Sequence, residues 1–328
     1  MTKDSKPTKS RVSGVILIDK PQGITSQQVV SKVKYLLKSP NHDSKKAGHT
    51  GTLDPMATGL LPVCLGEATK FSHYQLDAYK SYQAVIKLGQ QTDTGDAEGQ
   101  VVTEMAVPDI DQQMLNKVAE QFTGYIEQIP PMYSALKKDG KKLYEYARAG
   151  IEVERKSRPL HITKLSLQPG NAEDGLILDV TCSKGTYVRV LGEDIAAALG
   201  SVGHLTALRR TQVGEFDIAN AITLDQLEAL EHEQRLAALL GIDACIPDIP
   251  VLVVSDEDCA RLHMGQRLNV KSQIKSELET YIADALKAVA ADNEQAVDIR
   301  LFSADNQFLG LGRLEANGRL QPKKMIQR

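Results

Sequence analysis

The sequence contains no tryptophan and little cysteine. Its 328 residues include four widely spaced cysteines without a C-x-x-C pair: Cys64, Cys182, Cys245 and Cys259. That spacing indicates neither a zinc site nor a disulfide framework, and it is typical of buried thiols in a reducing cytosol. We therefore expect a cytoplasmic protein without a bound metal.

Long hydrophobic runs and nucleotide-binding motifs are absent as well. After a polar, basic N-terminus, the apolar run at 15–18 is far too short for a signal-peptide core or a membrane span. Neither G-x-G-x-x-G nor a P-loop motif occurs, so a dinucleotide or P-loop fold would lack its phosphate-binding loop. We expect a soluble protein that has no membrane partner and needs no cofactor.

Charge is nearly balanced overall but unevenly distributed. The net charge is −3, although residues 1–50 hold ten Lys/Arg against three Asp/Glu and residues 131–164 hold nine against four. The remaining residues therefore carry about fifteen net negative charges. Such asymmetry is expected when one face meets a polyanion, and it also fits a solvated lysine-rich surface with a basic tail.

The most informative stretch is a loop at 46–62. Its seventeen residues include three glycines and two prolines, which prevent a continuous helix. The loop holds one carboxylate, Asp54, and one imidazole, His49. Asp54 precedes Pro55, which favours extended backbone. From the residues alone, Asp54 either projects from the loop as a reactive group or only bonds nearby backbone N–H groups in an Asx turn.

Periodicity predicts alternating strands and helices around this loop. We expect a buried strand at 14–20, then a helix that begins near Thr25 and carries apolar residues at helical spacing to Leu37. Further strands are expected at 81–88, 160–167 and 176–182, and Arg189 is expected in the first turn of the next helix.

Five motifs along the chain resemble those of the tRNA pseudouridine synthases of the bacterial TruB type. The longest, AGHTGTLDPMATGLLPVCLGEATKF at 47–71, resembles the catalytic segment of that family. The others are KPQGITS at 20–26, PPMYSALK at 130–137, SKGTYVR at 183–189 and GHLTALRRT at 203–211. Together the motifs extend over most of residues 12–250.

The resemblance implies roles for three central residues. Asp54 matches the essential carboxylate, Arg189 matches the arginine that pairs with it, and Tyr82 matches the tyrosine that contacts the flipped uracil. Without the resemblance, an isolated arginine is more often a surface ion pair and a strand tyrosine is more often a packing residue. A guanidinium stays charged in any realistic environment, so it can keep a neighbouring carboxylate ionised.

Four further residues match substrate-contacting positions of the family. His49 matches the residue that fills the space vacated by flipped nucleotides, and Leu208 matches the apolar floor under the uracil. Lys20 lies in the element beside the active site, and Lys137 lies near the site in a segment where basic residues alternate with tyrosines. Such a segment can grip phosphates and stack on exposed bases.

The resemblance also implies the fold. We expect an α+β pseudouridine-synthase fold with a mixed, largely antiparallel sheet flanked by helices, plus a small C-terminal PUA-like β-barrel domain. The expected divisions are a disordered basic tail at 1–11, a catalytic domain at 12–248 and the PUA-like domain at 249–328. An amphipathic stretch near 276–291 predicts a helical insertion in the last of these.

The implied activity is conversion of uridine to pseudouridine at position 55 in the TΨC arm of tRNA, by base flipping. The resemblance also allows a second, tRNA-folding activity, and we expect a monomer without an obligatory protein partner. Two other classes stay open: an RNA chaperone without chemistry, and a carboxylate-nucleophile glycoside hydrolase. A hydrolase would need a second acid at a defined distance from Asp54.

Overall fold

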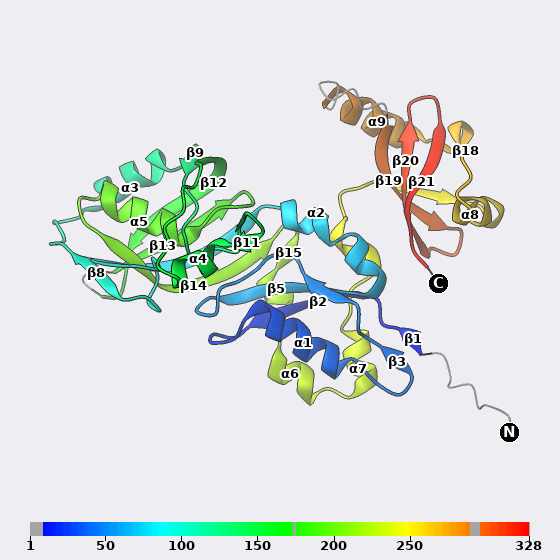
Figure 1. The fold of residues 1–328 in the computed structure, drawn as a ribbon. Coiled ribbons are helices and arrows are strands. Elements are labelled where there is room, and N and C mark those ends of the chain that lie inside the picture. The colour runs from blue at the N-terminus through cyan, green and yellow to red at the C-terminus, as the bar shows by residue number, and fades with distance from the viewer. Residues whose placement is uncertain (1–8, 173–174, 289–295, 328) are drawn as a thin grey trace.

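A large mixed sheet forms the scaffold of the computed structural model, which describes residues 9–172, 175–288 and 296–327. Figure 1 shows this sheet crossing the molecule, with helices against it and a smaller sheet at one end. Eight strands follow one another across it: β16 (Ile222–Thr223), β2 (Gly14–Lys20), β5 (Thr58–Leu65), β14 (Gly203–Val213), β6 (Lys80–Leu88), β13 (Gly175–Cys182), β12 (Arg158–Pro169) and β9 (Gly124–Gln128). Two more, β4 (Ala47–His49) and β15 (Phe216–Asp217), pair with β5 and β14.

Most neighbouring strands in this sheet run antiparallel. The exceptions are β14 beside β5 and β16 beside β2, which are parallel. The predicted mixed, largely antiparallel sheet is therefore confirmed. Three two-stranded pairs lie outside it: β1 (Ser10–Arg11) with β3 (His42–Asp43), β7 (Gln90–Thr92) with β8 (Val101–Glu104), and β10 (Lys137–Lys138) with β11 (Lys141–Lys142).

Helix α1 (Ser26–Leu36) follows from its sequence. Thr25 caps it, because its side chain accepts from the Gln28 backbone N–H, while the Gln28 side chain accepts from the Thr25 N–H. The apolar residues at helical spacing are buried against β2 and β5. Other helices of this part are η1 (Gly66–Lys70), α2 (Ser72–Asp77), α3 (Gln112–Gln121), α4 (Leu143–Arg148), α5 (Val188–Ala198), η2 (Ile218–Asn220), α6 (Leu224–Ala229), α7 (His232–Ala237) and η3 (Ile242–Cys245).

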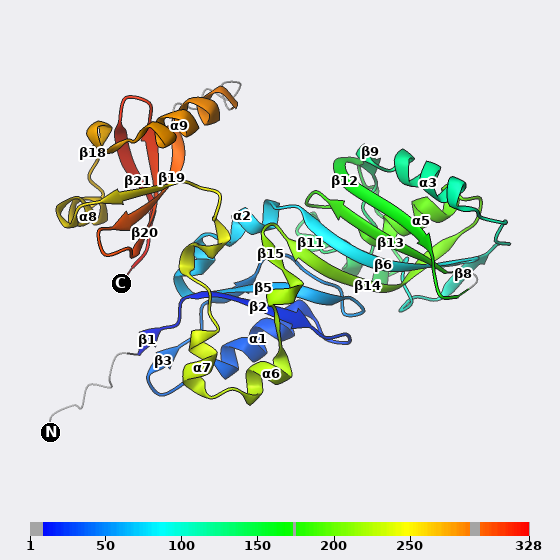
Figure 2. The ribbon, with the colours of Figure 1, turned by 180° about the vertical axis from the view of Figure 1, so that it is seen from behind.

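Two apolar cores flank the middle of the sheet. One packs α1 and α6 against β2 and β5, and the other packs α3 and α5 against β6, β12 and β13. The second core also contains Leu53, Met56 and Ala57, which surround Asp54 in sequence. Figures 1 and 2 show α1 and α5 over different parts of the sheet. The Asp54 loop thus lies where the two halves meet.

The C-terminal residues form a separate, curled half-barrel sheet. Its strand order is β17 (Val251–Val254), β19 (Ala296–Ser303), β20 (Phe308–Glu315), β21 (Arg319–Met325) and β18 (Leu268–Asn269). In the part of this region that the structure describes, three helices accompany these strands: α8 (Asp256–His263), η4 (Lys271–Gln273) and α9 (Ser276–Ala288). Helix α9 occupies the predicted helical insertion, whose residues 289–291 lie outside the described part.

The two sheets are joined by an apolar cluster and by polar contacts. Phe71 packs edge to face on Phe308, with ring centroids 5.4 Å apart. The Tyr74 hydroxyl donates to Asp298 at 2.6 Å, and Arg300 pairs with Asp243 at 2.8 Å. The smaller sheet is therefore anchored directly to the first.

One expectation about local structure needs correction. Ser10 and Arg11 form β1 and pair with β3, although they were predicted to belong to a disordered tail; residues 1–8 of that tail lie outside the described part. The Ser10 N–H also donates to the Asn41 carbonyl at 2.8 Å. Only two residues of β1 pair with β3, which is too few for an alternating pattern of apolar and polar residues to be recognised in the sequence. No helix in the described ranges is long and apolar enough to span a membrane.

We predict that Gly59→Ala strongly destabilises the protein. Gly59 has φ +101°, and a Cβ there would lie 2.2 Å from the Arg210 carbonyl oxygen of the neighbouring strand. We expect a loss of about 2–4 kcal/mol in the free energy of unfolding, measured by urea denaturation. Gly48→Ala is the matched control on the adjoining strand, because nothing lies within 4 Å of its Cβ position. Equal effects of the two substitutions would contradict the prediction.

Candidate active site

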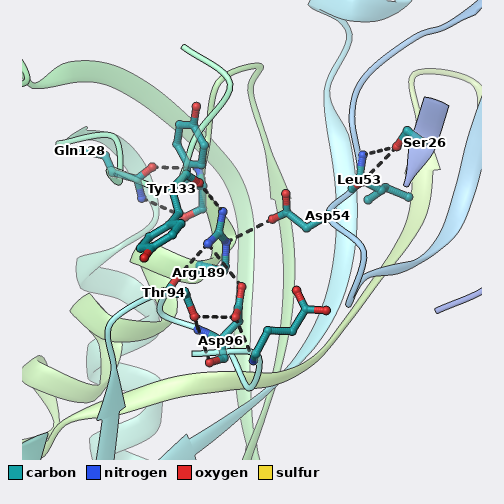
Figure 3. Close-up of polar contacts among 10 residues, drawn as sticks. Ser26, Leu53, Asp54, Thr94, Asp96, Gln128, Tyr133 and Arg189 are labelled. Carbon is teal, nitrogen blue, oxygen red and sulfur yellow. Dashed lines mark hydrogen bonds and ion pairs between the residues drawn. The ribbon is translucent and has the colours of Figure 1, made fainter. Parts of the chain in front are cut away.

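The Asp54 loop is fixed from beneath through its backbone. The Ser26 hydroxyl donates to the Leu53 carbonyl at 3.0 Å and accepts from the Leu53 N–H at 2.8 Å. The Ala57 N–H donates to the Asp54 carbonyl at 3.1 Å, which closes a turn around Pro55. The side chain of Asp54 itself stays 40% exposed. The loop is therefore held through its backbone, and Figure 3 shows the Asp54 side chain extending from it toward Arg189.

Lys20 contributes to the same anchorage from the end of β2. Its buried ammonium donates to the carbonyls of Pro21 at 2.9 Å, Pro55 at 3.3 Å and Ala57 at 2.6 Å. Burial lowers the pKa of Lys20 to about 8, and the nearby Asp54 carboxylate acts in the opposite direction. An ammonium has three N–H groups, one for each carbonyl. Lys20 thus supports the loop from below.

Arg189 brings three loops together around Asp54. It lies in the first turn of α5, as predicted, and its Nε is 3.1 Å from Asp54 Oδ2. Its Nη1 and Nη2 donate to the carbonyls of Thr94 and Tyr133, each at 2.8 Å. The side chain is only 7% exposed. A guanidinium bonded on several sides has a fixed orientation, so it fixes the direction of the carboxylate.

Asp96 is a functional candidate to which the sequence analysis gave no role. Its Oδ2 lies 3.3 Å from Arg189 Nη1, and its side chain is 4% exposed. The Thr94 hydroxyl and the Glu98 N–H both donate to Asp96 Oδ1, at 2.6 Å and 3.1 Å. This second carboxylate balances the charge of Arg189. Asp96 lies in the polar run after β7, which indicates a loop. That run does not show that Asp96 pairs with Arg189, far along the chain.

Tyr82 and Leu208 lie on the same face of neighbouring strands. Leu208 is opposite Ala84 in the register of β14 and β6, and Tyr82 is opposite Arg210 two residues along. Leu208 is buried in the core cluster, and Tyr82 packs against it, partly buried. Burial raises the pKa of Tyr82, while the Arg210 guanidinium acts against this effect. The two residues form an apolar and aromatic surface beside the Asp54 loop.

His49 ends strand β4 at the entrance of the loop. Its Nδ1 accepts from the Gly51 N–H at 3.3 Å. Burial, and secondarily the charge of Arg210, lowers the pKa of His49. The imidazole is therefore neutral at physiological pH, which agrees with a space-filling role better than with an ionic contact.

Lys137 is the one predicted site residue that stays outside this arrangement. It is exposed on β10, four residues after Tyr133, whose carbonyl bonds Arg189. Around it lie cation–π pairs, with Lys141 4.8 Å from the Tyr146 ring and Lys142 5.4 Å from the Tyr144 ring. The β10–β11 hairpin is thus a basic and aromatic surface rather than part of the carboxylate site.

Tyr187 is a second candidate that sequence reasoning overlooked. Its backbone is clamped by Gln128, whose side chain accepts from the Tyr187 N–H at 2.8 Å and donates to its carbonyl at 3.2 Å. Burial raises the pKa of Tyr187. The charge of Arg189 acts against this shift, and the charge of Asp54 adds to it. Tyr187 lies in the SKGTYVR motif, two residues before Arg189, and this position was its sequence signal.

The arrangement suits chemistry by one carboxylate on a substrate placed over Tyr82 and Leu208. Asp96, a second carboxylate near Asp54, is buried and occupied by Arg189, so it is not placed as a general acid. Glycoside hydrolysis by Asp54 with Asp96 as the acid is therefore disfavoured. Among the described residues, no group of three or more His, Cys, Asp or Glu could hold a metal ion.

Family models match nearly all of the chain. The model described as "TruB family pseudouridylate synthase (N terminal domain)" matches residues 40–188. A "tRNA pseudouridylate synthase B C-terminal domain" model matches 189–246, and a "Pseudouridine synthase II TruB, C-terminal" model matches 250–326.

Curated relatives are similar over almost their whole length. A tRNA pseudouridine synthase B from Psychrobacter cryohalolentis is 61% identical, covering 98% of this chain and 96% of the relative. One of the same name from Aromatoleum aromaticum is 46% identical over 96% and 93%. Among solved structures, an archaeal box H/ACA sRNP Nop10-Cbf5 complex matches with a TM-score of 0.65, at 22% identity, over 95% of this chain and 85% of that one. That likeness is one of fold.

We predict that Lys20 gives the activity an alkaline limit near pH 8. Deprotonation leaves two N–H groups for three carbonyls, so the Asp54 loop loses an anchor. The pKa of Lys20 is about 8 in the folded protein and 10.5 ordinarily. Between these pH values the unfolded chain binds the proton and the folded protein does not, so a rise in pH stabilises the fold through this group. The expected loss is therefore one of activity, measured as kcat/KM on the modification reaction against pH.

Lys20→Met is the comparison for this prediction. We expect it to fold, to have about 10- to 100-fold lower kcat/KM at pH 7, and to lack the alkaline limb near pH 8. An unchanged alkaline limb in Lys20→Met would show that another group is responsible.

Proposed function

This chain belongs to the TruB family of pseudouridylate synthases, and from that premise we propose that it isomerises uridine to pseudouridine at position 55 in the TΨC arm of tRNA. Support for the substrate class comes from curated relatives named tRNA pseudouridine synthase B, 61% identical in one case. The observation that carries the proposal is the Asp54–Arg189 pair, at 3.1 Å, beside Tyr82 and Leu208. Asp54 is the catalytic carboxylate.

The reaction needs no redox step and no net hydrolysis. The N1–C1′ bond breaks, the uracil turns, and a C5–C1′ bond forms, while the C5 proton leaves and N1 gains one. Asp54 acts as a nucleophile at C1′ or C6, or as a base on the sugar to give a glycal. Each route requires an ionised, oriented carboxylate, and the guanidinium of Arg189 supplies the orientation.

A uridine in a folded tRNA must leave its stack before Asp54 can reach it. Extrusion costs a few kcal/mol, which contacts to the flipped base offset. We assign Tyr82 to the face of the uracil and Leu208 to the floor below it, since both lie on one face beside the loop. His49, neutral at the loop entrance, fills the space that the base vacates. Tyr82 also accepts the proton from C5.

Binding rests on contacts outside the carboxylate site. Lys137 and its neighbours on the β10–β11 hairpin are exposed and stand next to tyrosines, a combination suited to RNA phosphates and unstacked bases. We propose that one chain in the cytoplasm acts without an obligatory protein partner or cofactor, and that it also assists tRNA folding. This folding activity depends on binding and not on Asp54.

We predict that Asp54→Asn abolishes pseudouridine formation while tRNA binding stays within about threefold of wild type. An unmodified tRNA transcript is the substrate, and each uridine is probed by chemical labelling and primer extension. Asp77→Asn is the matched control, because Asp77 is 61% exposed and pairs only with Lys184 on the surface. Wild type and the control should label position 55.

Two results would separate the alternatives. A wild-type chain that binds tRNA but modifies no uridine favours the chaperone reading and removes the catalytic roles. Pseudouridine elsewhere, with position 55 unmodified, keeps the enzyme but contradicts the proposed site. The folding activity is measured separately, as the rate at which misfolded tRNA regains aminoacylation with Asp54→Asn.

We predict that Lys137→Ala weakens tRNA binding and lowers its salt dependence. Removing one phosphate contact should reduce the slope of log Kd against log salt by about one and leave kcat at saturation unchanged. Lys117→Ala, an exposed lysine on α3, serves as the control and should leave the slope unchanged. A slope unaltered by Lys137→Ala would remove Lys137 from the RNA interface.

A further inference from the structure

Arg210 is a buried cation to which the site described above gives no role of its own. It is 1% exposed on β14, and its Nε donates to the Leu60 carbonyl at 2.7 Å. Its Nη2 donates to the Gly51 carbonyl at 3.1 Å, in the loop that leads to Asp54. Within the described ranges, no carboxylate forms an ion pair with it. Neutral carbonyls alone leave most of its charge uncompensated.

A buried charge of this kind is costly. Removing a guanidinium from water without a counter-ion disfavours the folded state, and a neutral amide side chain could bond two carbonyls without that cost. The neighbouring Lys80 is also buried, and burial followed by the charge of Arg210 lowers its pKa to about 8. The region therefore maintains a positive potential that packing alone does not require.

The partner for this potential is Tyr82. Arg210 and Tyr82 are directly opposite in the register of β14 and β6, so their side chains project from the same face as neighbours. Gly51 lies directly against the guanidinium: the position that a Cβ would take there is 3.5 Å from Arg210 Nη1, an ordinary van der Waals distance. The same guanidinium thus adjoins the phenol and holds the Asp54 loop.

We propose that Arg210 is a positioning residue for Tyr82: it orients the phenol and stabilises the phenolate that takes the proton from C5 of the uracil. The inference deepens the proposed function and rests on it. Hydrogen bonds in an empty site are often long and tighten when substrate is bound, so the guanidinium need not be fully engaged beforehand.

The step balances as a proton transfer. Once C5 is joined to C1′, C5 still carries its original hydrogen. Tyr82 gives its phenol proton, through water, to N1, and this leaves a phenolate. The C5–H bond then breaks: its proton passes to that phenolate oxygen, its electron pair becomes the C5–C6 double bond, and the pair of the N1–C6 double bond returns to N1. No oxidant or further reactant is required.

Other groups that act on Tyr82 do not supply this stabilisation. Cys182 on β13 is a neutral thiol, since burial raises its pKa to about 11, and Asp54 is an anion that opposes a phenolate. Burial also raises the pKa of Tyr82. Arg210 is the cation that acts on the phenol in the favourable direction.

The test compares Arg210→Lys and Arg210→Gln with wild type on tRNA carrying uridine or 5-deuterouridine. We expect kcat to fall about 100-fold in Arg210→Gln, with KM and tRNA Kd within about threefold. The deuterium isotope effect on pseudouridine formation should rise, because loss of the C5 proton becomes rate-limiting. Arg210→Lys, which keeps the charge, should recover part of the rate. Thermal melting verifies that each variant folds.

Arg209→Lys is the matched control, because Arg209 is adjacent in sequence yet pairs with Asp19, at 2.7 Å. A double-mutant cycle with Tyr82→Phe distinguishes an action through Tyr82 from general support of the fold. If Arg210 acts through Tyr82, Arg210→Lys should lower the rate little further in the Tyr82→Phe background. Additive losses, or no increase in the isotope effect, would overturn the inference, as would Arg210 variants behaving like Arg209→Lys. A wild-type chain that forms no pseudouridine refutes the proposed function instead.

Discussion

The site depends on one ionic arrangement, the guanidinium of Arg189 held between Asp54 and Asp96. Arg189 is nearly buried, so its charge requires partners, and the two carboxylates and two loop carbonyls supply them. Removing one partner from such a buried group typically costs about 3–5 kcal/mol. The same contacts tie α5 to the loops that carry Thr94, Tyr133 and Asp54. The carboxylate is therefore oriented by interactions that also hold the three loops together.

Backbone carbonyls determine where this arrangement lies. Lys20, Ser26 and Arg210 each bond carbonyl groups of the Asp54 loop or its flanks, and each comes from a different element. A loop rich in glycine and proline makes few bonds of its own, so buried donors from the sheet and from α1 must satisfy it. Rigid scaffolding around a partly exposed carboxylate is the geometry that preorganised catalysis needs. The buried cations below the loop thus hold the backbone on which the proposed chemistry depends.

Local structure followed closely from the sequence because it rests on short-range rules. The cap at Thr25 and the spacing of Val29, Val30 and Val33 specified α1, and alternation specified β6 and β13. The shortest elements show the limits: β1, with two residues, formed where a tail was expected. Elements of two to six residues owe their conformation to their neighbours rather than to periodicity.

The sequence by itself determined the family and pointed to the loop and the residue types of the candidate site, since a long run of consecutive residues around Asp54 carries the resemblance. Only the tertiary structure decided which distant groups meet. Asp96 and Asp54 converge on Arg189 from loops that are separate in sequence, and Arg210 faces Tyr82 through the register of two strands. Pairing of this kind depends on strand order and on loop paths, which no local pattern encodes. The structure also placed Lys137 on an exposed hairpin rather than in the carboxylate site, because β10 and β11 pair only with each other.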